Sequence, residues 1–411
     1  MPQRSTRAVS LPTVSRRAVG IVYATALLQG LTMVSFPASS TVLTSGLGLS
    51  SAQYGAIFLP QVALAIVGSL GGGILAQKWG LKTLLALAMA ANAASQVLLA
   101  ATMWVAPGLV YPAVLAGTAS MGLAFGVSGA PLNSYPSLIF PEMSDTAVVA
   151  LHSILGAGLA LGPVLVAPFV ARDAWIGFPI LLAALCVLTL VAIPLLSLPE
   201  DQTVNDTTAS PRPVGTGLFW VFVIAAVAYA FAEGTFSNWA VIYLHEARGV
   251  PEATAGIALS VFWAALVAGR LLTSVLVLRV SSQAVWLVLP LLMGATFLLL
   301  PFAEGAVLGI GLFAIAGLAC SSFFPLAITL ISRAFPEHVA WASSMMIAAL
   351  MVGVGGGSFI FGPLQNAFSF ETIYRLSTLY PAVALIAAVI VVRSEPCRET
   401  IHDLWSGSRC R

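Results

Sequence analysis

Twelve apolar segments, separated by short polar stretches, run along this chain of 411 residues. Each segment holds roughly 20 predominantly apolar residues, the length that crosses the hydrocarbon core of a bilayer as a helix. We therefore expect an all-α membrane protein with twelve transmembrane helices, at residues 19–43, 54–76, 83–103, 108–131, 146–170, 174–198, 217–243, 254–278, 283–302, 305–331, 341–367 and 372–393.

A polar stretch without apolar periodicity divides these segments into two groups of six. It contains Pro199, Pro211 and Pro213, so we expect a solvated connection there rather than a helix. The predicted organisation is a six-helix bundle over residues 1–198, a linker over 199–216, a second six-helix bundle over 217–393 and a polar tail over 394–411.

Glycine and proline positions of the first group recur in the second group at offsets close to half the chain length. The pairs are Gly55 and Gly256, Gly68 and Gly269, Pro131 and Pro325, and Gly162-Pro163 and Gly362-Pro363. Such repetition is typical of transporters that are built from parallel structural repeats. We therefore predict two pseudo-symmetric six-helix bundles.

Lysine and arginine are distributed unevenly between the two predicted sides of the membrane. Three lie on one side, Arg270 lies within a segment, and 13 of the 17 share the side of the N-terminus: Arg4, Arg7, Arg16, Arg17, Lys78, Lys82, Arg212, Arg279, Arg333, Arg393, Arg398, Arg409 and Arg411. Cytoplasmic loops carry such an excess of cations. We therefore expect a multi-pass protein of the cell membrane with both termini in the cytoplasm.

The composition agrees with a lipid environment and limits the function classes. Hydrophobic residues make up 59% of the chain and charged residues only 8%, whereas a soluble domain carries about 25% charge. The net charge of +2 comes without a basic patch, so no nucleic acid is expected as a partner. No phosphate-binding loop, HExxH or GxSxG sequence occurs. We therefore expect neither an enzyme nor ATP-driven transport, and no cofactor or metal.

The loop between the second and third segments carries a recognisable motif. It reads Gly73-Ile-Leu-Ala-Gln77-Lys78-Trp-Gly80-Leu81-Lys82. The chain thereby resembles the major facilitator superfamily, whose pattern here is Gly-x-x-x-Asp-Arg-x-Gly-Arg-Lys. The resemblance implies that this is a gating loop. Gln77 replaces the acid and Leu81 replaces a cation, so the charge lock between neighbouring helix ends is expected to be weak.

Three later segments are similar to the fucose–galactose–proton symporter group and its bacterial relatives. The similar positions are Tyr229, Glu233, Trp239 and Tyr243 in the seventh segment, Ser260, Phe262, Trp263, Gly269 and Arg270 in the eighth, and the run from Gly317 to Pro325 in the tenth. The resemblance implies proton-coupled transport of a sugar-like solute by a protein that is a monomer by default. The chain departs from the group because its first half has no acid in mid-membrane.

Three ionisable residues lie inside predicted spans and away from the span ends, where a charge costs at least about 2.5–3.5 kcal/mol. Glu233 is the candidate proton-coupling group, or alternatively forms a structural ion pair with Arg270. Arg270 is a candidate ligand for an anionic or hydroxylated solute. Alternatively, it extends toward the cytoplasmic face or only pairs with Glu233. His152 is a candidate proton relay, or a packing residue.

Six further residues are candidates for solute contacts. Gln29, Asn133 and Asn238 carry amides that both donate and accept hydrogen bonds, and Trp239, Trp263 and Phe324 offer rings for stacking. The alternatives are amides that bridge helices and aromatic rings that pack in the core or face lipid. Glu233 and Asn238 would border one cavity only if the helix broke between them, and Gly234 favours such a break.

The leading hypothesis is a secondary active transporter that moves a small polar organic solute, sugar-like or another organic metabolite, by alternating access, with a proton as the coupling ion. Two alternatives stay open at this point. One is a proton-antiport exporter of amphipathic or toxic compounds, and the other is a transport-silent membrane sensor or assembly partner.

Overall fold

The computed structural model describes residues 15–199 and 215–394 of the chain, and these residues form helices and turns without a strand. Within these described ranges, twelve helical stretches are long and apolar enough to cross a membrane, which confirms the predicted number. Nearly all of the predicted tail and of the predicted linker lies outside the described residues, and so do six of the 13 cations placed on the N-terminal side.

The first six spans consist of α1 to α6, and the last six consist of α7 to α14. The bounds in the first group are α1 Arg16–Ala38, α2 Ser51–Ala56, α3 Phe58–Ala101, α4 Pro107–Ile139, α5 Ser144–Val170 and α6 Gly177–Ala192. The bounds in the second group are α7 Gly217–Ile242, α8 Glu252–Leu276, α9 Ser282–Leu299, α10 Gly305–Cys320, α11 Phe323–Ala334, α12 Val339–Leu364, α13 Phe370–Leu376 and α14 Leu379–Arg393.

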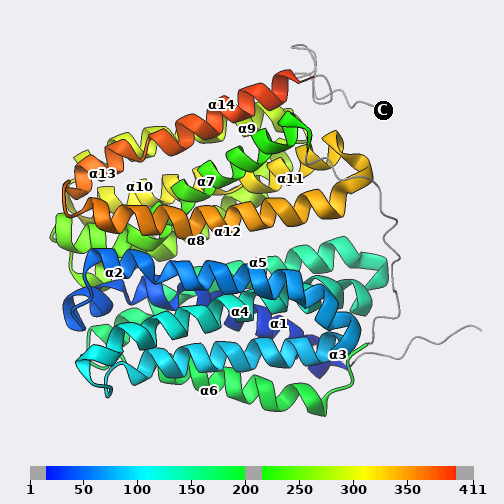
Figure 1. Cartoon of the computed structure of the whole chain (residues 1–411), viewed down its shortest axis with the longest axis horizontal. Helices are drawn as coiled ribbons and strands as arrows, with labels where there is room; N and C mark the ends of the chain where they lie inside the picture. Colours follow the sequence, from blue (N-terminus) through cyan, green and yellow to red (C-terminus); the bar gives the residue numbers. More distant parts are fainter. Residues whose placement is uncertain (1–14, 200–214, 395–411) are drawn as a thin grey trace, which may run out of the picture.

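The two groups form two bundles that lie side by side, with the axes of all long helices roughly parallel (Figure 1). Successive spans alternate in direction, so α1 begins and α14 ends on the same side of the molecule. We call this the terminus side, and the other the opposite side. Between the bundles, α5 packs against α8, and α12 packs against α2 and α3.

Serine side chains fix the start of several helices. Ser15, Ser50, Ser281 and Ser369 each accept a hydrogen bond from a backbone N–H of the first turn that follows. These N–H groups have no partner within the helix, so a serine cap contributes about 1 kcal/mol at each end. The caps hold the short helices α2 and α13 in place at the opposite side.

Span seven is continuous, and our expectation of a break at Gly234 is wrong. The helix α7 runs through this residue without interruption. A Cβ atom at Gly234 would lie only 2.4 Å from the Val354 carbonyl oxygen on α12. Glycine is therefore required for the close approach of two helices, not for a bend.

The break occurs instead in span ten. The helix α10 ends at Cys320 and α11 begins at Phe323, and Ser321 and Ser322 form the turn between them, with Ser322 departing from helical backbone angles. Carbonyl groups at the end of a helix lack the partner that the next turn would supply. In a bilayer, side chains of neighbouring helices must then supply the donors.

The bundles meet most closely at the opposite side. A Cβ atom at Gly55 would lie 2.7 Å from the Ser358 carbonyl oxygen, and one at Gly362 would lie 2.3 Å from that of Ser51. Small residues allow this backbone-to-backbone approach of membrane helices. Side chains reinforce it, since the Thr41 hydroxyl donates to Glu252, and Tyr54 donates to the Asn238 carbonyl oxygen over 2.8 Å.

We predict that Gly362→Ala destabilises the folded protein by about 1–3 kcal/mol, because the added methyl group overpacks this seam. The measurement is thermal unfolding of the purified protein. Gly311→Ala is the matched control, since Gly311 lies inside a helix with open space where its Cβ atom would be. An unfolding temperature of Gly362→Ala equal to that of the control would contradict the predicted packing.

Candidate functional site

A cavity of about 470 Å³ lies between the bundles, in the half of the molecule nearer the terminus side. The helix α5 forms its wall on the first bundle, and α8, the break of span ten and α11 form its wall on the second bundle. Most of the lining is apolar, with side chains such as Val149, Leu271 and Leu326. Two ionisable side chains interrupt it: His152 from α5 and Arg270 from α8.

Glu233 and Tyr229 lie one turn apart on α7 and form a hydrogen bond through Glu233 Oε2 and the Tyr229 hydroxyl. The same hydroxyl is 2.8 Å from the Cys320 carbonyl oxygen, where α10 ends. Tyr229 is fully buried, and its ring is stacked on Phe323 and Phe324 just beyond the break. The Tyr229 hydroxyl is therefore positioned between the Glu233 carboxyl and the broken helix.

Arg270 holds the next carbonyl of the same break. Its Nε atom donates to the Ser321 oxygen over 3.1 Å, and the Gly269 Cα approaches Ser321 so closely that a Cβ atom there would lie 2.5 Å from the serine side chain. The positive charge of Arg270 acts on both Glu233 and His152. Among the described residues, however, no ion pair within 4.0 Å joins Arg270 to Glu233. The alternative of a direct Glu233–Arg270 ion pair therefore finds no support.

His152 and Asn133 form a pair on the first bundle. His152 Nε2 is 3.0 Å from Asn133 Oδ1, and Asn133 Nδ2 donates to the Gly129 carbonyl oxygen over 2.7 Å. With Asn133 oriented so that Oδ1 faces the ring, the amide oxygen is the acceptor and His152 Nε2 is the donor of this contact. The sequence did not indicate this pairing of α4 with α5.

Two predicted solute contacts, Asn238 and Trp239, lie instead in the tightly packed seam at the opposite side. Asn238 donates to the Ser358 hydroxyl over 2.6 Å and is 6% exposed. Trp239 is fully buried between Phe361, with ring centroids 4.5 Å apart, and Tyr54, with centroids 5.1 Å apart. In this conformation both side chains seal the bundles together, so their expected grouping with Glu233 around one cavity is not observed.

Gln29 lies inside the first bundle. Its side chain oxygen accepts from Asn92 over 2.9 Å, and Asn92 accepts from the Thr32 hydroxyl over 3.0 Å. The neighbouring Gln96 donates to Ser35 over 2.9 Å. All of these side chains are fully buried, and they join α1 to α3. Gln29 therefore has the helix-bridging contacts that formed the alternative to a solute contact.

Trp263 and Phe324 occupy intermediate positions. Both are half-buried; the Trp263 ring meets Phe262 edge-on, and Phe324 stacks on Tyr229 with centroids 6.5 Å apart. The Trp263 indole N–H is buried and has no acceptor among the described residues. Phe324 thus packs near the Tyr229 ring, and Trp263 offers a free donor.

The predicted gating loop lies at the terminus side, where the chain changes direction within α3. Gly80 has φ +81°, which favours glycine. Gln77 and Lys78 are exposed, whereas Lys82 Nζ donates to the carbonyl oxygens of Pro194 and Leu196, over 3.1 and 2.7 Å. Gly73 belongs to the helical part of the same segment. Lys82 therefore closes the end of span six within its own bundle.

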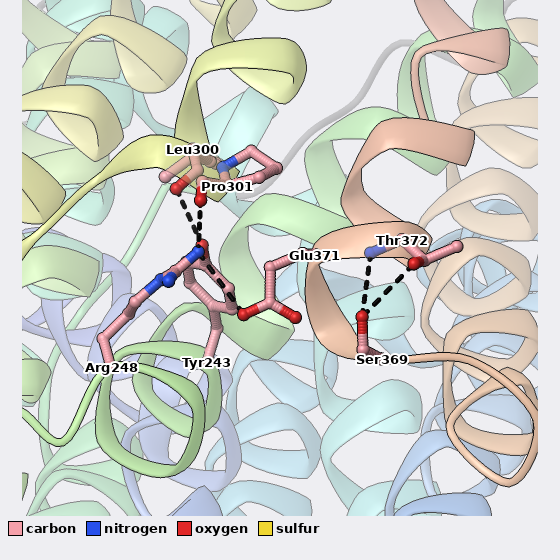
Figure 2. A network of polar contacts seen from close by, with 7 residues as sticks. All are labelled: Tyr243, Arg248, Leu300, Pro301, Ser369, Glu371 and Thr372. Atoms are coloured by element: carbon pink, nitrogen blue, oxygen red, sulfur yellow. Dashed lines mark hydrogen bonds and ion pairs between the residues drawn. The ribbon is translucent and has the colours of Figure 1, made fainter.

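Arg248 forms a polar network at the opposite side of the second bundle (Figure 2). It donates to the Tyr243 hydroxyl over 3.0 Å and to the Pro301 carbonyl oxygen over 2.6 Å, and pairs with Glu371 at 3.4 Å. Tyr243 in turn donates to Leu300 over 2.7 Å. The network ties the ends of spans seven, nine and twelve together, so it belongs to the scaffold rather than to the cavity.

Comparison with known proteins places this geometry in a family. The family model described as Major Facilitator Superfamily matches residues 21–309 and 222–406. An uncharacterised MFS-type transporter of Yersinia pestis is 22% identical over 378 residues, which are 90% of this chain and 92% of that protein. An uncharacterised transporter of Sinorhizobium fredii (strain NBRC 101917 / NGR234) is 25% identical over 289 residues, 66% of this chain and 72% of that protein.

Solved structures share the fold at low sequence identity. A mutant of the nucleoside transporter NupG is 15% identical with a TM-score of 0.74, covering 92% of this chain and 100% of that chain. A D-xylose-proton symporter is 16% identical with a TM-score of 0.73, covering 91% and 97%. The transporter FucP in its outward conformation is 18% identical with a TM-score of 0.58, covering 91% and 98%. This chain is a multi-pass membrane transporter that belongs to the major facilitator superfamily.

Proposed function

We propose that the protein is a proton-coupled secondary transporter that moves a small organic solute by alternating access. The cavity between the bundles is the solute site, and the linker at residues 199–216 connects two units that rock about it. The protein resides in the cell membrane with its termini in the cytoplasm, so the cavity faces the cytoplasm in this conformation. A monomer suffices, because both walls of the cavity come from one chain.

The position of Tyr229 is the observation that carries the proposal of proton coupling. Its hydroxyl has a single proton but lies within hydrogen-bond distance of two acceptors, Glu233 Oε2 and the Cys320 carbonyl oxygen. Both bonds form together only when Glu233 is itself protonated and donates to the tyrosine oxygen. An ionised Glu233 instead accepts the hydrogen bond from the Tyr229 hydroxyl, and the Cys320 carbonyl oxygen is left without its donor.

The protonation state of Glu233 is thereby linked to the break in span ten. A carbonyl group without a donor in a membrane interior costs a few kcal/mol. Loss of the Glu233 proton therefore destabilises the observed arrangement of α10 and α11 and favours a rearranged one. The break contributes Ser322 to the cavity wall, so this rearrangement reaches the solute site.

A second candidate function is proton-driven export of amphipathic compounds. The apolar lining of the cavity favours it, since few polar side chains are present to recognise a strongly hydrated solute. The two candidates differ in the direction in which solute and proton move. Deletion of the gene distinguishes them: loss of growth on a nutrient supports uptake, and sensitivity to hydrophobic compounds supports export.

We predict that Glu233→Gln abolishes the effect of a proton gradient on transport. A screen of metabolites for thermal stabilisation of the purified protein identifies a ligand, and uptake of that ligand is then measured in proteoliposomes. In the wild type an inward proton gradient accelerates uptake. The amide cannot cycle a proton, so the variant is expected to keep solute exchange at equal pH but to show no acceleration.

Glu246→Gln is the matched control, because Glu246 is a carboxylate near the other end of span seven, away from the cavity. The proton-coupling proposal is wrong if Glu233→Gln responds to the gradient as the control does.

The exposure of the cavity gives a further prediction. A cysteine introduced by Ser274→Cys, in the cavity lining, is expected to react with a membrane-impermeant maleimide applied from the terminus side. The same reagent is expected to leave Asn238→Cys unmodified, since that position is 6% exposed in the seam. Both variants are made with Cys397 and Cys410 replaced by serine. Equal labelling of the two positions would argue against a seal at the opposite side.

A further inference from the structure

We propose that the solute is an organic monocarboxylate, bound with its carboxylate on the Arg270 guanidinium and its apolar body along the cavity walls. The inference rests on the proposed transport function and names the class of solute for the same cavity. It differs from a sugar, the solute class that the sequence resemblance implies.

The hydrogen bonds of Arg270 leave most of its donors free. A guanidinium group has five N–H donors in a planar fork that matches a carboxylate. Among the described residues, only Nε donates to an acceptor, the Ser321 carbonyl oxygen. The fixed Nε bond orients the side chain, and the terminal nitrogens remain available to a ligand. Since Arg270 lines the cavity, this ligand is the solute.

The charges around the cavity favour an anion. Neither aspartate nor glutamate belongs to its described lining, whereas an arginine and a histidine do. The charge of Arg270 acts on the Glu233 carboxyl, but the two do not come within the ion-pair distance of 4.0 Å. An arginine in a membrane interior needs a counter-charge or acceptors. A carboxylate solute supplies both.

Most hydroxyl groups of the lining are already used within their own helices. Ser153, Ser274 and Thr329 donate to carbonyl oxygens of their own helices, over 2.8, 2.7 and 3.2 Å. Thr273 and Ser322 are the two other hydroxyl residues of the lining, and the remaining walls are mostly apolar, so few donors are left for the several hydroxyls of a sugar. Each sugar hydroxyl without a partner would cost free energy on binding. A molecule with one charged end and an apolar body meets this surface without such losses.

The same arrangement couples the anion to the proton. An ionised Glu233 acts on Arg270 as a second negative charge and competes electrostatically with a bound carboxylate. A protonated Glu233 leaves the full charge of Arg270 to the solute. Proton and carboxylate therefore favour each other's binding, and this coupling is reciprocal. Movement of one proton with one monocarboxylate carries no net charge across the membrane.

The test is equilibrium binding to the purified full-length protein, with benzoate as the anionic probe, benzamide as its uncharged analogue and xylose as the hydroxylated probe. Benzoate is expected to raise the unfolding temperature and to give a saturable binding isotherm, while benzamide and xylose give neither. Arg270→Gln is expected to weaken benzoate binding about 10- to 100-fold. Arg270→Lys keeps the charge but loses the fork and is expected to fall between the two.

The control variant is Arg279→Gln, which removes a cation beyond the end of the same helix and is expected to bind benzoate as the wild type does. Thermal unfolding without ligand establishes whether each variant is folded. If Arg270→Gln does not fold, the comparison of benzoate with benzamide on the wild type and on Arg270→Lys still decides the matter. Equal stabilisation by benzamide or xylose overturns the inference.

The pH dependence of binding tests the coupling. Between about pH 5.5 and 8 benzoate stays ionised, so the wild type is expected to bind it more tightly as the pH falls. Glu233→Gln is expected to lose this dependence. Because His152 also lines the cavity and its imidazole is a second group there that can take up a proton, His152→Gln is measured alongside and is expected to retain it. Retention by Glu233→Gln, or loss in His152→Gln, contradicts the coupling.

These measurements detect binding rather than transport. The proposed anion site and the proposed transport function can therefore be refuted separately. Benzoate binding that depends on Arg270, without gradient-driven uptake, would refute proton-coupled transport but not the anion site. Gradient-driven uptake of a neutral solute would refute the anion site but not proton-coupled transport.

Discussion

The carbonyl groups at the break in span ten must find hydrogen-bond donors, because lipid offers none. Two side chains from neighbouring helices meet this requirement: Tyr229 donates to the Cys320 carbonyl oxygen and Arg270 donates to that of Ser321. We assign a second role to each of these donors. The Tyr229 oxygen accepts a hydrogen bond from a protonated Glu233, and Arg270 directs its remaining N–H groups to the cavity. A local defect in one helix thus connects a candidate proton site with a candidate solute site.

The two bundles contribute unequally to this arrangement. At the opposite side, glycines on α2 and α12 allow backbone contact between the bundles, and Trp239 fills the seam next to them. Nearer the terminus side, the bundles leave a cavity. The second bundle supplies Glu233 and the cavity-lining Arg270. Among the residues that line the cavity, His152 is the one ionisable residue from the first bundle. Close packing at one end and ionisable groups at the other suit a protein that opens to one side at a time.

Much of the fold could be predicted from the sequence. Length and hydropathy indicated the number of spans, because an apolar segment of about 20 residues has few alternatives to a membrane helix. The loop at Gly80 and the similarity of the seventh, eighth and tenth spans to known symporters indicated the family. Local features were harder: a glycine in a helix marks either a bend or a close contact, and Gly234 proved to be a contact.

The candidate site could be predicted only in part. Glu233, Arg270 and His152 stood out because charge is rare within a membrane. Their distances depend on how helices from distant parts of the chain rotate against each other, which no local pattern specifies. For that reason Asn238 and Trp239 were grouped with the wrong part of the molecule, and the pairing of Asn133 with His152 was missed. The role of Tyr229 between Glu233 and the Cys320 carbonyl group could not be predicted, because the position of that carbonyl depends on the break in span ten.

The proposed coupling requires that Glu233 carries a proton in this conformation, since one Tyr229 proton cannot serve two acceptors. Infrared difference spectroscopy between the wild type and Glu233→Gln at neutral pH tests this most directly. We expect a carbonyl stretching band of a protonated carboxyl group that is present in the wild type, absent from the variant and shifted in Tyr229→Phe. A wild-type spectrum that contains only carboxylate bands for Glu233, under conditions in which the cavity is open to the terminus side, would contradict a protonated Glu233.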